Sequence, residues 1–313
     1  MIEVRNLTKI YVRQKAVDDV SFSIEKGEVF GFLGPNGAGK STTMRVLTCF
    51  IPATSGSATV AGHDVFRDSL RARRNIGYLP ESVPLYPEMR AREYLRFRAA
   101  VKGVSRGARR EQIGRAVERC GLGEVYNNII GTLSKGYRQR LGLAAALLGD
   151  PPVMILDEPT IGLDPNQVRE VRRVIKEMGA DRTVILSTHI LPEVEMMCGR
   201  VLIINRGRAV AIGTPAELAA AVEGKSKIDL DVRGSGERIS EALGRIRGVT
   251  CVACDQHGET VSIAVEIEKG RDVREEISAA LVASGGVIRE MRSRKLSLED
   301  IFAEMTGAGR VEL

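Results

Sequence analysis

The amino-acid sequence predicts an α/β domain followed by a smaller α+β domain. In the first part, a glycine-rich turn follows the apolar run 28–33, and strand and helix patterns alternate again from 153 to 205. Beyond about residue 224 the predicted order changes to strand, helix, strand, strand, helix and strand. The chain of 313 residues is long enough for two domains, and its 43% apolar residues suffice for two cores.

The glycine-rich turn has the sequence GPNGAGKST, which fits the phosphate-binding pattern G-x-x-x-x-G-K-[ST] at every specified position. Its glycines allow backbone N–H groups to close around phosphate oxygens. Lys40 can reach the β- and γ-phosphates and the hydroxyl of Ser41 can ligate Mg²⁺, while the following helix directs its positive dipole end at the phosphates. The turn therefore predicts binding of a nucleoside triphosphate with Mg²⁺, against the alternative of a plain turn between strand and helix. The predicted contacts are Gly34, Pro35, Asn36, Gly37, Ala38, Gly39, Lys40, Ser41 and Thr42.

The remaining elements of the first domain are expected in three parts. Residues 2–62 predict short strands, and residues 91–149 predict helices that end at Asp150 and two prolines. An α/β pattern follows, with a helix start at Asp164 and Pro165. The expected strands include 20–24, 29–33, 153–156, 183–187 and 201–205, and the expected helices include 93–101, 112–122, 140–148, 168–178 and 193–197.

The composition limits where in the cell the protein is expected and which partners it could bind. No window approaches the 18 apolar residues of a membrane span, and the first five residues lack the pattern of a signal peptide. The five cysteines are scattered and odd in number, as suits a reducing compartment, so we expect a cytoplasmic protein. The net charge is +6, but residues 65–115 hold 13 Lys or Arg against five Asp or Glu, a net of +8. This basic segment is either a docking surface for an anionic partner or a solvated face.

The apolar strand 153–156 ends in two carboxylates, Asp157 and Glu158. At a strand end, Asp157 would lie beside the Mg²⁺ held by Ser41, whereas Glu158 would point the other way and could polarise an attacking water as general base. Two surface acids that end a strand are the alternative. The pair therefore predicts hydrolysis of the bound triphosphate.

Between these motifs lies Leu133–Arg140, LSKGYRQR, directly before a predicted helix. Together with the order of the other motifs, it makes about the first 220 residues resemble the ATP-binding-cassette ATPases. In that family a Leu-Ser-Gly-Gly-Gln signature contacts the γ-phosphate bound to the opposite subunit, where the dipole of the helix behind it favours an anion. Ser134 and Gly136 match this signature, whereas Lys135 and Tyr137 depart from it. A plain helix cap is the alternative.

The resemblance implies roles for several further residues. Tyr11, ahead of Val17, resembles the aromatic residue that stacks on adenine, with an ordinary strand tyrosine as the alternative. Asp164 ends a loop that resembles the one crossing the dimer interface, although Asp164 is also placed to cap a helix. His189 resembles the switch histidine that contacts the γ-phosphate and orients the attacking water. Glu81 stands where the family usually has a glutamine hinge, so we expect it near Mg²⁺ and this water, against the alternative of an acid facing solvent.

The family implies a P-loop NTPase core with an antiparallel β subdomain and a helical subdomain at about 85–150. We expect the ATP-binding cassette domain over 1–222 and an α+β accessory domain of ferredoxin-like plan over 223–313. A last helix is expected at 298–305. The Leu-Pro-Glu hinge and the C-terminal sequence Leu-Ser-Leu-Glu-Asp-Ile-Phe look similar to ATPase subunits of ABC-2-type exporters, including the gliding-motility and copper-processing branches.

The resemblance implies hydrolysis of Mg-ATP at a head-to-tail homodimer, with two ATP molecules held between phosphate loops and opposing signature loops. Closure would drive export through a separate transmembrane permease, which would hold this subunit at the cytoplasmic face of the membrane. The aromatic and basic segment Ser82–Arg98 is the expected docking surface. The cassette of an importer stays open as a rival. So does an ATPase that remodels nucleic acid or ribosomes, supported by a pI of 9.1, but a single uninterrupted cassette argues against a nucleic-acid partner.

Overall fold

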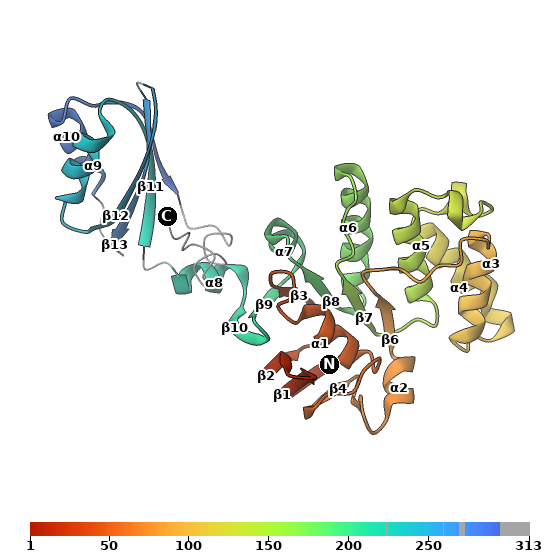
Figure 1. Ribbon diagram of the computed structural model, residues 1–313. Coiled ribbons are helices and arrows are strands. Elements are labelled where there is room, and N and C mark those ends of the chain that lie inside the picture. Colours follow the sequence, from red (N-terminus) through yellow and green to blue (C-terminus); the bar gives the residue numbers. More distant parts are fainter. Residues whose placement is uncertain (223–224, 259, 269–272, 295–313) are drawn as a thin grey trace. The chain divides into compact units, whose positions relative to one another are not determined.

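The computed structural model describes residues 1–222, 225–258, 260–268 and 273–294. The chain divides into two compact units, Met1–Thr214 and Pro215–Leu313 (Figure 1). The boundary expected from the sequence, between residues 222 and 223, lies one helix later and stays a prediction. The first unit has two sheets and the second has one, and each unit has a hydrophobic core of its own.

A six-stranded sheet forms the centre of the first unit, with the strand order β10-β9-β3-β8-β7-β6. Its strands are β3 (Val29–Leu33), β6 (Ile76–Leu79), β7 (Val153–Asp157), β8 (Thr183–Thr188), β9 (Arg200–Asn205) and β10 (Arg208–Gly213). The first five are parallel to one another, and β10 pairs antiparallel with β9. Because parallel strands share one carboxyl edge, the residues that follow β3, β7 and β8 are brought together there.

An antiparallel sheet shares its core with the six-stranded sheet. Its strands, in the order β2-β1-β4-β5, are β2 (Gln14–Ile24), β1 (Ile2–Tyr11), β4 (Ser55–Val60) and β5 (His63–Asp64). Helix α1 (Lys40–Leu47) contributes Met44 and Leu47 to the same buried cluster as Phe22 of β2 and Phe30 of β3. This packing fixes the start of α1 at the carboxyl end of β3.

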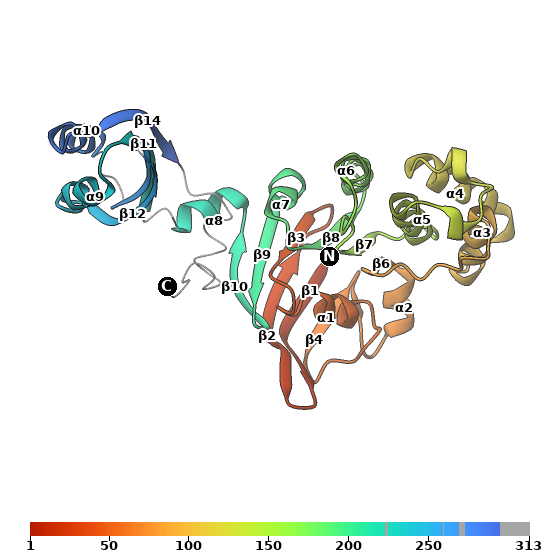
Figure 2. The same ribbon diagram turned by 45° about the horizontal axis from the view of Figure 1, so that its top comes forward.

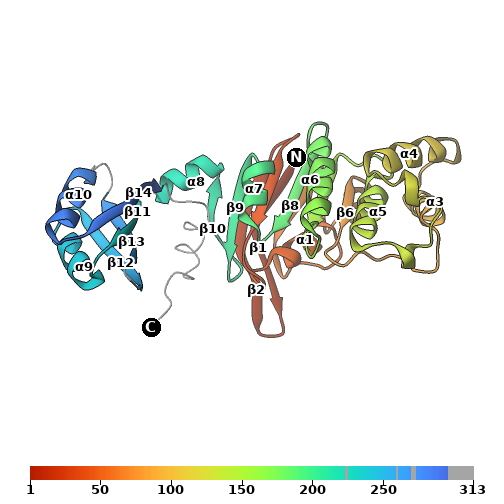
Figure 3. The same ribbon diagram turned by 90° about the horizontal axis from the view of Figure 1, so that it is seen from above.

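Three helices gather beyond the β6 edge of the six-stranded sheet (Figures 2 and 3). They are α3 (Ala91–Val101), α4 (Arg106–Arg119) and α5 (Lys135–Leu147), and two short 3₁₀ turns, Gly123–Val125 and Ile130–Thr132, lie between α4 and α5. The helices predicted over 91–149 are confirmed. Helix α4 begins six residues earlier than expected because its first turns are almost entirely polar and give no apolar period to read.

Three more helices belong to this unit, namely α2 (Ser69–Arg74), α6 (Pro165–Gly179) and α7 (Leu191–Met197). The predicted start of α6 is confirmed, since the carboxylate of Asp164 accepts hydrogen bonds from the backbone N–H groups of Asn166 and Gln167, each at 3.0 Å. Val171, Val174, Ile175 and Met178 form its buried stripe. The elements α2, β6 and β10 were not expected, because each has six residues or fewer and α2 and β10 show little alternation.

The second unit has the order α8 (Pro215–Val222), β11 (Lys225–Arg233), α9 (Gly236–Gly244), β12 (Val249–His257), β13 (Thr260–Glu268), α10 (Arg274–Ala283) and β14 (Val287–Arg294). The predicted sequence of strands and helices after residue 224 is confirmed up to residue 294. The sheet has the order β12-β13-β11-β14 with antiparallel pairing throughout. The helix expected at 298–305 lies outside the described residues.

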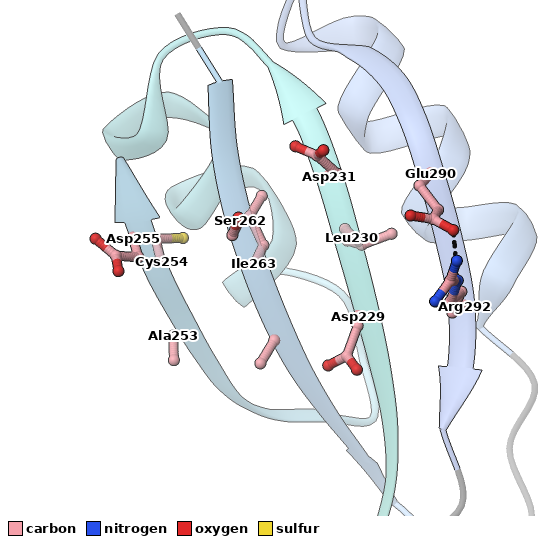
Figure 4. Close-up of a pocket in the computed structure, with 11 residues that line it drawn as sticks. Asp229, Leu230, Asp231, Ala253, Cys254, Asp255, Ser262, Ile263, Glu290 and Arg292 are labelled. Carbon is pink, nitrogen blue, oxygen red and sulfur yellow. Dashed lines mark ion pairs between the residues drawn. The ribbon is translucent and has the colours of Figure 1, made fainter. Parts of the chain in front are cut away.

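The two faces of the sheet in the second unit differ in the residues that they carry. Ile228, Leu230 and Val232 of β11 pack with Ile239 of α9 and Ile277 of α10, so both helices cover one face. The other face carries Asp229, Asp231, Asp255, Ser262 and an ion pair between Glu290 and Arg292, around a hollow of about 500 Å³ (Figure 4). The alternation of apolar and polar residues over 227–233 is the sequence signal of this arrangement.

Candidate active site

A cavity of about 310 Å³ lies at the carboxyl edge of the six-stranded sheet. Six of its lining residues come from the predicted phosphate-binding turn or the first residues of α1, namely Asn36, Gly37, Gly39, Lys40, Ser41 and Thr42. Ala16, Glu81, Glu158 and Ile161 complete the lining. The site is thus located where open α/β sheets bind ligands, just outside the carboxyl ends of the strands.

Glycine is required at two positions of the turn because backbone atoms crowd them. A Cβ atom at Gly39 would lie 2.4 Å from the carbonyl oxygen of Ala16, and φ at Gly39 is +109°. A Cβ atom at Gly34 would lie 2.5 Å from the carbonyl oxygen of Ile204 in β9. The turn is therefore pressed against backbone carbonyl groups on one side, so a side chain would not fit at either position.

Lys40 is buried, with 5% of its surface exposed, at the first position of α1. Its Nζ donates to the carbonyl oxygen of Gly34 at 2.7 Å and lies 3.1 Å from Oε1 of Glu158. The second contact is an ion pair by distance, although its geometry is not that of an aligned hydrogen bond. A buried ammonium group that already faces an anion is suited to hold the oxygens of a phosphate.

Asp157 contacts Ser41, which lines the cavity. The hydroxyl of Ser41 donates to Oδ1 of Asp157 at 3.1 Å, and the hydroxyl of Ser187 donates to the same oxygen at 2.5 Å. A hydroxyl and a carboxylate side by side are hard oxygen ligands of the kind that Mg²⁺ takes, with phosphate oxygens and water completing its shell. These residues therefore fit the predicted metal site.

Glu158 and His189 form the second pair. Nδ1 of His189 lies 2.9 Å from Oε2 of Glu158, and because an ionised carboxylate only accepts, Nδ1 carries the proton in this contact. Glu158 has φ at +48°, and its backbone N–H donates to the carbonyl oxygen and the hydroxyl of Ser187. Its carboxylate is thereby held between Lys40 on one oxygen and His189 on the other.

The other predicted site residues lie at different places. Glu81 lines the cavity but is exposed to solvent, so the structure brings it to the site without burying it. Tyr11 ends β1 with 41% of its surface exposed and has the ammonium of Lys9 over its ring at 5.2 Å. Val17 is fully buried in the core, and its neighbour Ala16 is the residue that lines the cavity. Contacts of Tyr11 and Val17 with a nucleotide stay predictions.

The signature residues do not line this cavity. Ser134 caps α5 and accepts a hydrogen bond from the N–H of Tyr137 at 3.3 Å. The side chain of Lys135 packs against Gly162, and Gly136 packs against Gln167, so the start of α5 lies beside the loop that ends at Asp164. One chain therefore holds the phosphate loop and the signature as two separate surfaces.

Several buried polar residues at the site were not found from the sequence. Ser187 joins Asp157 to the backbone of Glu158, and Thr188, Thr160 and Glu193 form a further buried group behind His189. A signal was available, since β8 is an apolar strand that ends in two hydroxyl residues. Hydroxyl residues at the carboxyl edge of a parallel sheet are therefore candidate site residues, as the carboxylates are.

Comparison with known proteins agrees with this geometry. Residues 17–161 match the family model described as ABC transporter. The linearmycin resistance ATP-binding protein LnrL of Bacillus subtilis is 33% identical, covering 98% of each chain. The daunorubicin/doxorubicin resistance ATP-binding protein DrrA of Streptomyces peucetius is 31% identical, covering 98% of this chain and 92% of the relative.

Solved structures resemble the first unit. A structure of the ATP-binding subunit of an ABC transporter is 31% identical with a TM-score of 0.65, covering 71% of this chain and 92% of that one. A dimeric ATP-binding cassette in a post-hydrolysis state with ADP and Pi is 25% identical with a TM-score of 0.63, covering 68% of this chain and 98% of that one. Within the described residues, no helix has the length and apolar character to cross a membrane.

Proposed function

The chain belongs to the ATP-binding proteins of ABC transporters, and from this premise we propose that it hydrolyses Mg-ATP in a head-to-tail homodimer that drives an ABC-2-type permease. It is an ABC-type ATPase, and the observation that supports the dimer is the separation of its two phosphate-binding surfaces. Lys40 and Glu158 meet at the cavity, whereas Ser134 and Gly136 lie elsewhere on the same chain. A second copy, turned around, would supply the missing signature to each cavity.

The roles of the residues follow from their contacts. A γ-phosphate would compete with Glu158 for Lys40 and so release Oε1 to polarise the attacking water. His189 would keep Oε2 occupied and fix the orientation of the carboxylate. Ser41 and Asp157 would hold Mg²⁺, which when bound neutralises the charge that develops on the phosphates.

Exchange of subunits between two inactive variants tests the head-to-tail dimer. Lys40→Met damages the phosphate loop, and Ser134→Arg places a bulky side chain at the exposed start of α5. We expect neither variant alone to hydrolyse ATP. A mixed dimer would contain one site with both defects and one site with none, so an equal mixture should recover up to about a quarter of the wild-type rate. A mixture as inactive as its parts, with subunit exchange shown by cross-linking, would contradict the arrangement.

A groove of about 400 Å³ supports docking of the permease at the segment Ser82–Arg98. It lies between the core and the helical region and is lined from one side by Phe50 and Tyr78 and from the other by Tyr94 and Arg98. Tyr86 packs beside the groove with its ring against Tyr94 and Phe97. Burial, and next the charge of Asp157, raise the pKa of Tyr78 to about 12, so its hydroxyl stays neutral.

The docking proposal is tested by Phe50→Asp combined with Tyr86→Ala. Phe50 has 73% of its surface exposed, so the fold should tolerate the change. We expect loss of co-purification with a multi-span membrane protein at unchanged basal ATPase activity. Val282→Asp, at an apolar position on α10 that is 67% exposed, is the control. Arg90 is unsuitable for charge reversal because its guanidinium donates to the backbone carbonyl of Asn127 at 2.6 Å.

Further parts of the proposal concern the rest of the chain. We infer a ferredoxin-like plan for the accessory domain, at 223–313, from the antiparallel order β12-β13-β11-β14 with both helices on one face. We place the protein at the cytoplasmic face of the membrane through its permease. The relatives are named for resistance to linearmycin and to daunorubicin/doxorubicin, which favours an antibiotic-like cargo. The gliding-motility and copper-processing branches stay a prediction.

A further inference from the structure

A fully buried carboxylate lies directly behind the proposed catalytic pair. Glu193, in the first turn of α7, has no exposed surface. Its Oε2 accepts hydrogen bonds from the hydroxyls of Thr160 at 2.9 Å and Thr188 at 3.0 Å. Its Oε1 forms an ion pair with Nη2 of Arg172 on α6 at 3.2 Å. The carboxylate therefore has partners on both oxygens, from α6, from β8 and from the turn after β7.

The two hydroxyls lie close in sequence to the two residues of the catalytic pair. Thr160 follows Glu158 by two residues, after β7, and Thr188 directly precedes His189, at the end of β8. The hydroxyl of Thr188 also accepts the backbone N–H of Ile190 at 3.0 Å, which fixes the backbone on the far side of His189. One oxygen atom of Glu193 thus ties together the loop of the general base and the loop of the histidine.

The cost of this arrangement argues for a role beyond packing. Removing a carboxylate from water is expensive, and apolar residues of similar volume often hold helices together at least as well. The contact between Glu158 and His189 depends on two separate loops, and catalytic groups have to be held within about 0.5 Å of their working geometry. Oε2 of Glu193 meets that requirement because it accepts hydrogen bonds from residues beside both catalytic groups. An apolar side chain could not accept these hydrogen bonds.

We propose that Glu193 is a positioning residue that keeps Glu158 and His189 in register for ATP hydrolysis. The inference rests on the proposed roles of those two residues. Glu193 acts only through Thr160 and Thr188 and touches neither the nucleotide cavity nor the reacting atoms.

A matched pair at Thr188 tests this positioning without removing the buried charge. Thr188→Val deletes the hydroxyl at nearly constant shape, whereas Thr188→Ser retains it. A misplaced catalytic group can cost about 100-fold in rate, so we expect Thr188→Val to lower kcat about tenfold or more while KM and ATP affinity stay within about twofold. Thr188→Ser should restore kcat to near the wild-type value. Glu193→Leu, which removes both acceptor oxygens, should behave like Thr188→Val.

A variant that is less stable but keeps the hydrogen bonds of Glu193 distinguishes an effect on positioning from an effect on stability. Val174→Ala removes buried methyl groups from α6 and should lower Tm while leaving kcat at 25 °C unchanged. The inference is overturned if Thr188→Val keeps kcat within about twofold of wild type, or if kcat falls equally in Thr188→Ser or Val174→Ala. Wild-type protein that shows no hydrolysis above the level of Glu158→Gln would instead refute the proposed function, so the two failures are distinguishable.

Discussion

The six-stranded sheet of the first unit and the sheet of the second unit differ in the burial of their acidic residues. At the edge of the six-stranded sheet, Asp157, Glu158 and Glu193 are 2%, 4% and 0% exposed, and each has named partners. On the face of the second unit's sheet that α9 and α10 leave uncovered, Asp255 and Glu290 are exposed (Figure 4). Charges removed from water interact strongly with what they touch, whereas exposed charges are screened. The buried set is therefore the one suited to chemistry.

Strand direction explains this difference. Parallel strands end at one edge, so β7 and β8 deliver their last residues to the same place. Antiparallel strands alternate in direction, so the acids of β11, β12 and β14 spread over a face instead of converging on a point. Three predictions test how far the catalytic function belongs to the first sheet alone.

The largest effect is expected at Glu158. Glu158→Gln removes the general base, which should lower the ATPase rate by about 10² to 10⁴ while ATP binding is retained and an ATP-dependent dimer accumulates. Turnover and size measured with and without ATP check this. Glu241→Gln, an exposed glutamate of α9 paired with Arg245, is the control from the second unit and should change neither. Wild-type turnover in Glu158→Gln would refute the assignment.

A smaller effect is expected at Glu81, which reaches the same cavity but is exposed. Its negative charge should attract Mg²⁺, yet solvent screening limits an exposed pair to about 1 kcal/mol, or roughly fivefold in affinity. We expect Glu81→Gln to raise the free Mg²⁺ needed for half-maximal ATPase rate by up to that factor. The measurement is the ATPase rate of the wild type and of Glu81→Gln as a function of free Mg²⁺. Coincident curves would show that Glu81 only faces water.

The smallest effect on nucleotide binding is expected from removal of residues 223–313. All residues that line the cavity belong to the first unit, so the truncated protein should bind Mg-ATP within about twofold of the full chain. Its dimer equilibrium or its activity with the permease should change instead. Isothermal titration with ATP and sedimentation measure the two properties. Insoluble protein or lost binding would show that the second part completes the cassette core.

The sequence predicted those parts of the site in which residue type and spacing carry the chemistry. The phosphate loop, Asp157 and Glu158 were identified because glycine or charged residues at a strand end leave few structural alternatives, whereas His189 was named through the family resemblance. All of them meet in the structure as contacts at or beside one cavity. The helices over 91–149 and the elements after residue 224 could also be predicted, because their hydrophobic periodicity extends over enough residues to be recognised.

The parts that could not be predicted depend on tertiary contacts. Ser187, Thr160 and Thr188 are ordinary hydroxyl residues in sequence, and their roles exist only because β7 lies beside β8. Glu193 lies in a short helix whose pattern gives no hint of burial. The groove at Phe50 likewise combines residues from distant segments, which no local pattern can bring together.

The left-handed backbone of Glu158 has a consequence for how this protein can be improved. A residue other than glycine at φ +48° is strained by about 1 to 3 kcal/mol, and here the strained residue also carries a buried charge. Selection for thermal stability alone would thus favour glycine or asparagine at this position and eliminate the proposed general base. Random libraries screened for heat resistance should accumulate such inactive survivors, so a screen for a hardier ATPase has to score turnover together with folding.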